Sequence, residues 1–173
     1  MTGSLIKITE TTVSSATASV TLTGIDSTYD VYMLKMDNVT PDTDNVHLNM
    51  RSTVGGSADT SAEYDWAGKV LRTNTTFGNQ YGTDQTSMRI SDETIGTGTQ
   101  EILNGIIYIF NANNSSEYTF YTNENSVRTA SGNLSGTQGG FVHTETQATD
   151  GVNLFMSSGN ISAGQFVLYG LKK

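Results

Sequence analysis

Histidine is the first residue type to consider, because imidazole can act as a base or ligate a metal near neutral pH. The chain has two histidines, His47 and His143. His143 and Glu145 alternate in "VHTET", so in an extended strand both side chains lie on one face. A metal site needs three or four converging ligands. We therefore expect no bound metal. The alternative is a site repeated around a threefold axis, to which each chain contributes one histidine.

The other histidine, His47, is predicted to lie on the polar face of a strand in "VHLNMR", next to an acidic segment. The segment "DNVTPDTDN" carries three carboxylates of the kind that calcium accepts, Asp37, Asp42 and Asp44. It departs from the calcium-loop pattern, because Val46 replaces an acid or amide and His47 replaces the glycine. The segment is therefore predicted to be an acidic turn.

Motifs for covalent or cofactor chemistry are absent from the chain. It contains no cysteine, no G-x-S-x-G, no phosphate-binding P-loop and no G-x-G-x-x-G. The "GTGTQE" segment that begins at Gly96 has glycines but no phosphate-binding lysine, and it is typical of a turn. We expect no enzymatic activity and no cofactor.

Aromatic side chains offer a different kind of site. Tyr64 and Trp66 alternate in "EYDWAG" and would face the same way in a strand. Such a pair could form a sugar-stacking platform or a protein interface. The alternative is that Trp66, the sole tryptophan, belongs to the core. Tyr81, in "FGNQYGTDQ", is predicted to lie exposed on a loop.

The elements that must position these residues show a period of two. In "SATASVTLTG", Ala16, Ala18, Val20 and Leu22 alternate with Ser and Thr, which is typical of a strand with one buried face. Clusters of Gly, Asn, Asp, Ser and Thr separate about nine to eleven such segments. The pattern predicts an all-β, antiparallel β-sandwich with little helix, forming a single domain over residues 1–173.

Three segments are apolar on both faces: Tyr29–Met36, Ile102–Phe110 and Phe166–Leu171. A strand in an antiparallel sheet usually has one solvated face. These segments are therefore predicted to be central strands, or strands covered by another layer or another subunit.

The last of these segments shows the problem most clearly. Alternation divides it into two sets, and the first set, Phe166, Leu168 and Gly170, is predicted to fill the core. The second set would then face outward and need a cover, most simply a neighbouring subunit. Its members are Val167, Tyr169 and Leu171.

Composition narrows the choice of partners. The chain has 17 Asp and Glu against 9 Lys and Arg, for a net charge of −8. Nucleic-acid binding needs clustered basic residues, and here only Lys172 and Lys173 form a basic pair. No apolar run approaches the roughly 18 residues that span a membrane. We therefore expect neither nucleic acid nor membrane as a partner.

Two stretches resemble a known group of proteins. The segment "GIDSTYDVYMLKMDNVTPDTDNVHLNMR" (Gly24–Arg51) and the segment "SSGNISAGQFVLYGLKK" (Ser157–Lys173) resemble structural proteins of tailed bacteriophages. That group includes capsid decoration (cement) proteins, head fibres and tail-fibre components. The resemblance covers about a quarter of the chain and carries no catalytic residues.

The resemblance implies a jelly-roll sandwich that assembles as a homotrimer and resides in the virion after synthesis in the host cytoplasm. The first expectation for function is a decoration protein that binds the phage major capsid protein on the outside of the head. The alternative is a tail-fibre or receptor-binding domain that recognises host glycan through Tyr64, Trp66 and Tyr81. A third reading, an enzyme such as a depolymerase, usually requires a longer chain.

Overall fold

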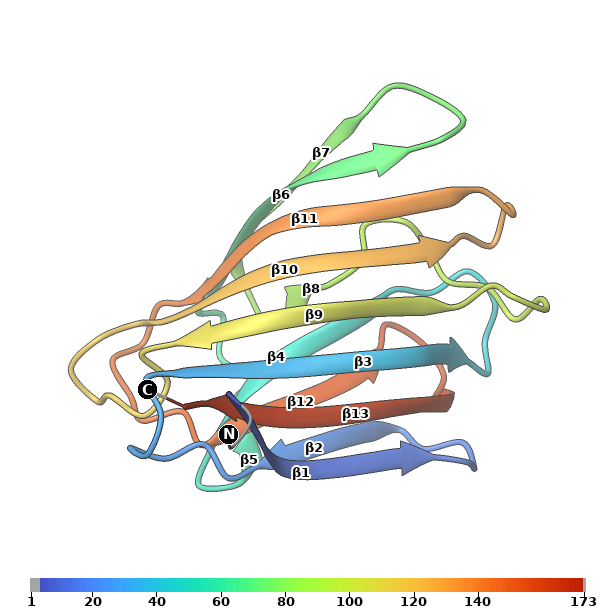
Figure 1. The fold of residues 1–173 in the computed structure, drawn as a ribbon. Coiled ribbons are helices and arrows are strands. Elements are labelled where there is room, and N and C mark those ends of the chain that lie inside the picture. The colour runs from blue at the N-terminus through green and yellow to red at the C-terminus, as the bar shows by residue number, and fades with distance from the viewer. Residues whose placement is uncertain (1–3, 173) are drawn as a thin grey trace.

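The computed structural model describes residues 4–172 and is built entirely from antiparallel strands, turns and loops (Figure 1). In chain order, the strands are β1 (Leu5–Val13), β2 (Ser19–Thr23), β3 (Val31–Pro41), β4 (Leu48–Val54), β5 (Ser57–Ala58), β6 (Tyr64–Arg72), β7 (Gly78–Gln85), β8 (Met88–Arg89), β9 (Leu103–Phe110), β10 (Thr119–Arg128), β11 (Leu134–His143), β12 (Gly151–Met156) and β13 (Ile161–Leu171).

These strands form two sheets packed face to face. The large sheet has eight strands in the order β1-β13-β3-β9-β10-β11-β6-β7. The small sheet has the order β2-β12-β4-β5, and β8 pairs with β4 beside it. The predicted all-β antiparallel sandwich is confirmed, and the residues described contain no helix. Jelly-roll connectivity stays a prediction.

The core lies between the two sheets, and the period of two determines which side chains enter it. Along β10, every second residue is buried, so Tyr121 and Val127 point inward while Phe120 and Glu124 point outward. The small sheet contributes side chains such as Val152 and Leu154 to the same core, and both are fully buried. The large sheet therefore has an inner face covered by the small sheet and an outer face on the opposite side (Figure 1).

The three segments predicted to be apolar on both faces are neighbours in space. They form β3, β9 and β13, and the large sheet contains them side by side in the order β13-β3-β9. Their inner residues, such as Leu34, Ile107 and Phe166, are fully buried in the core. The prediction that these strands are central is confirmed, and their outward residues gather in one region of the outer face.

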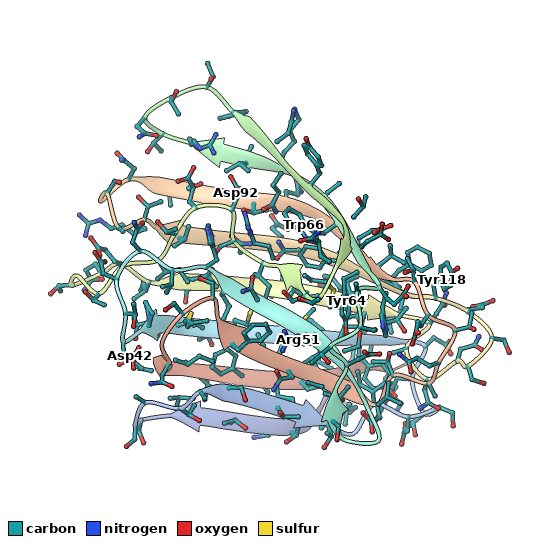
Figure 2. The ribbon with its side chains drawn as sticks, turned by 180° about the vertical axis from the view of Figure 1, so that it is seen from behind. Asp42, Arg51, Tyr64, Trp66, Asp92 and Tyr118 are labelled. Carbon is teal, nitrogen blue, oxygen red and sulfur yellow. The ribbon has the colours of Figure 1, made fainter. Side chains whose placement is uncertain are left out.

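The two stretches that carry the resemblance also meet in the structure. β3 pairs with β13 along almost its whole length, and the turns beyond them are joined by Asp42 (Figure 2). Its carboxylate accepts hydrogen bonds from the backbone N and the Nδ2 of Asn160, both at 2.7 Å. Gly159 has φ of 70°, and a Cβ there would lie 2.1 Å from Thr43 Oγ1. These motif residues therefore serve turn geometry and strand pairing.

Both edge strands of the large sheet pair irregularly with their neighbouring strands. β1 forms one edge, and its register with β13 shifts between Lys7 and Thr9. β7 forms the other edge, and its register with β6 shifts between Tyr64 and Trp66. The β6–β7 hairpin extends past the small sheet (Figure 1). Bulges of this kind bend and twist a strand.

Two phenylalanines that differ in burial should differ in how much their replacement destabilises the fold. Phe166 is fully buried and Phe77 is 65% exposed. We expect Phe166→Ala to lower the free energy of unfolding by about 3–5 kcal/mol, because it removes buried area and leaves a cavity. The control Phe77→Ala should change it by less than about 0.5 kcal/mol. Urea unfolding measures both, and equal effects would contradict the described packing.

Candidate functional site

The outer face of the large sheet carries a continuous apolar surface. Strand register places Leu5 opposite Leu171 and places Phe110 between Val31 and Phe120. The adjacent row joins Tyr169, Met33 and Tyr108. We call this surface the outer band, and its members are Leu5, Val31, Met33, Tyr108, Phe110, Phe120, Val142, Tyr169 and Leu171.

The members of the outer band pack sideways on one another, and all of them except the buried Met33 keep apolar surface open to solvent. Phe120 is 47% exposed and Leu5 is 43% exposed, while Tyr108 and Phe110 are half-buried. Within the described residues, no element of the chain lies over them, since the small sheet packs on the opposite face. Contiguous apolar surface of this kind marks an interaction site.

The three residues of β13 that were predicted to need a cover differ in their burial. Tyr169 and Leu171 lie in the outer band and remain half-buried. Val167 is only 3% exposed in the single chain, so the prediction that it needs a neighbouring subunit is wrong. It lies between Glu10 and Lys35 in the strand register, and their long side chains flank it.

A row of charged side chains borders the outer band. Moving across the sheet, register places Glu10, Lys35, Glu124 and Lys69 at the same level, with one residue between each and the next. The charges therefore alternate in sign along the row. An apolar centre with a charged or polar rim is the usual anatomy of a protein–protein interface.

At the β7 end, the outer band leads into a depression of about 460 Å³. Tyr81 and Phe120 contribute aromatic rings to its lining, and Ala67 and Gly140 keep its floor low. Tyr81 is 80% exposed, as expected, but it lies on strand β7 and not on a loop. Asp65 adds a carboxylate to the lining.

The predicted aromatic platform does not form on the surface. Tyr64 and Trp66 do face the same way, but that way is inward, with exposures of 0% and 8%. Figure 2 views the molecule from the side of the small sheet and shows both residues on β6. The alternative that Trp66 belongs to the core is correct, and the guanidinium of Arg89 lies 5.3 Å from its ring centroid.

A buried polar cluster surrounds Tyr64. Its ring stacks on the imidazole of His143, with centroids 4.6 Å apart and an interplanar angle of 14°. Its hydroxyl donates to the carbonyl of Asp59 at 3.0 Å and accepts from the backbone N of Ser52 at 3.2 Å. Ser52 Oγ is in turn 2.6 Å from the hydroxyl of Tyr121. Burial raises the pKa of Tyr64 to about 12 and raises the pKa of Tyr121, so both hydroxyls stay protonated at neutral pH.

His143 is fully buried at the end of β11, so the alternative that it faces a threefold axis is wrong. Its Nε2 lies 3.3 Å from Asp59 Oδ2. Burial lowers the pKa of His143, and nearby carboxylates oppose this only in part. Burial alone would raise the pKa of Asp59, but hydrogen bonds from Ser61 and Gln147 outweigh it and lower that pKa.

Asp59 joins His143 and Glu145, the two residues that the sequence placed on one face of a strand. A ring nitrogen of His143 and one oxygen each of Asp59 and Glu145 lie within 4.8 Å of one another. Across residues 4–172, this is the one such cluster of His, Cys, Asp or Glu ligand atoms. Asp59 was missed because it follows β5, and only the folded sandwich brings that loop to the end of β11.

The acidic segment disperses its carboxylates. Asp37 pairs with Lys35, Asp42 binds Asn160, and Asp44 accepts from the backbone N of Thr97 at 3.1 Å. The prediction of an acidic turn holds only for the second half of the segment: Asp42 and Asp44 lie in the bend after β3, whereas Asp37 belongs to β3 itself. His47, however, lies just before β4 and is half-buried, with Nδ1 3.1 Å from the carbonyl of Ser91.

Comparison with known proteins found no protein-family model, no curated protein and no solved structure that matches this chain. None of the described residues belongs to a helix that is long and apolar enough to cross a membrane.

The two histidines predict a pH dependence of stability. Burial lowers the pKa of both His47 and His143 below 6.5 in the folded state. The unfolded chain therefore binds protons more readily, and stability present above pH 6.5 falls as the pH drops through that value. We expect urea unfolding in EDTA to show lower stability at pH 5 than at pH 7.5. The His47→Gln variant should show a smaller loss, and a rise in stability toward pH 5 would contradict the assignment.

Proposed function

We propose that this chain is a structural virion protein, a decoration protein that binds the outer surface of a bacteriophage head and stabilises it. The observation that carries the proposal is the outer band, an uncovered apolar surface with a charged rim on a sheet that already has its core on the other face. The sequence resemblance of Gly24–Arg51 and Ser157–Lys173 to phage structural proteins supplies the virion context.

The proposed mechanism is surface burial without chemistry. In this proposal the outer band is the contact between the subunits of a homotrimer, where Tyr108, Phe110 and Phe120 form the apolar centre. Aromatic residues at the centre of an interface usually carry most of its binding energy. The trimer then presents three copies of one footprint to the major capsid protein, and simultaneous engagement multiplies modest affinities.

Stabilisation of the head follows from mass action. A protein that binds the assembled shell, and not its separated subunits, shifts the equilibrium toward the shell in proportion to its occupancy. The buried tyrosines and the absence of nucleophile motifs fit a protein that acts by contact. The acidic net charge of −8 favours a capsid surface that presents basic side chains.

A charge placed in the outer band tests this proposal. We expect the unaltered chain to sediment as a trimer and Phe120→Asp to sediment as a folded monomer, because burial of an unpaired carboxylate is costly. In particles of the virus that encodes it, the unaltered chain should be present in proportion to the major capsid protein, and Phe120→Asp should be depleted.

The matched control is Phe77→Asp, which alters another exposed phenylalanine outside the outer band. It should leave the mass in solution and the content in particles unchanged. A monomeric unaltered chain, or a trimer that survives Phe120→Asp, would remove the outer band from the subunit contact. A handful of copies per particle would refute the decoration role.

A second candidate function rests on the depression next to the outer band. Tyr81 and Phe120 present aromatic rings there, and Asp65 and Thr122 add polar groups to the same lining. Aromatic faces with nearby hydrogen-bonding groups are suited to sugars. In this case the chain would be a receptor-binding domain that recognises a host glycan.

Tyr81→Ala separates the second candidate from the first. If the chain binds glycan, the variant should lose signal on a glycan array by tenfold or more, since it removes an exposed stacking surface. Tyr118→Ala is the matched control, because Tyr118 is an exposed tyrosine outside this depression. A silent array with the unaltered chain, together with unchanged virus adsorption by the Tyr81→Ala variant, would eliminate the glycan role.

A further inference from the structure

We propose that Asp59, His143 and Glu145 bind one divalent transition-metal ion of the zinc type at the end of the sandwich. This site is independent of the outer band and of the proposed virion role. It would join the loop that follows β5, which belongs to the small sheet, to the end of β11, which belongs to the large sheet.

The spacing of the two nearest groups is that of metal ligands. His143 Nε2 and Asp59 Oδ2 are 3.3 Å apart. A charge-assisted N–H···O hydrogen bond would be about 2.7–2.9 Å long. Two ligands at about 2.1 Å from a tetrahedral zinc ion lie roughly 3.4 Å from each other. All three ligand atoms already lie within 4.8 Å of one another, so a modest movement of the Glu145 side chain would complete the set.

The imidazole of His143 is a second, independent observation. It is fully buried, its Nδ1 has no hydrogen-bond partner, and its Nε2 makes two long contacts, 3.3 Å to Asp59 Oδ2 and 3.4 Å to Gln147 Nε2. Buried polar groups are nearly always well paired. Stacking on Tyr64 holds this ring with Nε2 toward the Asp59 carboxylate at a distance longer than a charge-assisted hydrogen bond, which suits Nε2 to ligate an ion placed between them.

The surroundings of Asp59 orient it for this role. Its Oδ1 accepts from the backbone N of Ser61 at 2.9 Å and from Ser61 Oγ at 2.7 Å, which leaves Oδ2 toward His143. Such outer contacts position ligating carboxylates in metal sites. Gln147 Nε2 donates to Oδ2 at 2.5 Å, and rotation of its carboxamide would present an oxygen instead. The Asp59 side chain is 16% exposed, so an ion can enter from solvent.

The donor set selects the class of ion. One imidazole nitrogen with two carboxylates suits zinc and related transition metals, whereas calcium and magnesium prefer oxygen ligands throughout. An open fourth position would hold water or the Gln147 oxygen. In a chain without cysteine, such an ion would fasten the two sheets where no disulfide can.

Calorimetric titration of the EDTA-stripped full chain with ZnCl₂ at pH 7.5 tests the site. We expect one ion bound per chain, and a melting temperature about 5 °C or more higher when free Zn²⁺ exceeds the Kd about a hundredfold. Co²⁺ should give the visible absorption bands of a low-symmetry N/O site. MgCl₂ at the same concentration should not shift the melting temperature.

Glu145→Gln should weaken Zn²⁺ binding at least tenfold while leaving the metal-free melting temperature close to that of the unaltered chain. Asp59→Asn should weaken it similarly. Glu117→Gln is the matched control, an exposed glutamate outside the cluster, and should leave binding unchanged. Absence of stoichiometric Zn²⁺ binding by the folded chain, or binding that survives Glu145→Gln undiminished, overturns the site.

Discussion

The small sheet covers one face of the large sheet and leaves the other face open, and the surface features of the molecule follow from this constraint. The neighbouring strands β13, β3 and β9 carry apolar side chains on both faces. Their inner residues build the core with the small sheet, and their outer residues create the outer band. A soluble monomer rarely maintains such a surface without a partner. The open face is therefore the surface that the proposed function assigns to the contact between subunits.

Sequence periodicity predicted the sandwich because alternation and turn residues are local properties. It also identified three strands that need cover on both sides, and the structure places them side by side. Sequence periodicity could not predict the strand register, because register depends on pairings between distant segments. Val167 is an example. Its outward direction was inferred correctly, but the inference that it needs a neighbouring subunit was wrong, because Glu10 and Lys35, from strands far away in the chain, flank it within one subunit.

The candidate sites show the same division. The period of two correctly put Tyr64 and Trp66 on one face, but it cannot say whether that face meets the core or the solvent. The charge on Asp59 was visible in the sequence, whereas its position beside His143 depends on how two loops meet. Tyr81 was identified as exposed from its polar neighbours, although those neighbours belong to a strand. Side-chain chemistry was thus predictable, and its convergence required the tertiary structure.

The bulges at the two sides of the large sheet have a consequence for how copies of this chain can associate. Lys7 and the shifted register of β1 interrupt one edge, and the irregular β6–β7 pairing bends the other. Interrupted edges resist the addition of a further strand from another molecule, which is the common route to fibres and to continuous sheets. Growth in the plane of the sheet is thereby discouraged. In the proposed assembly, contact through the open face rather than through these interrupted edges would favour a complex of finite size.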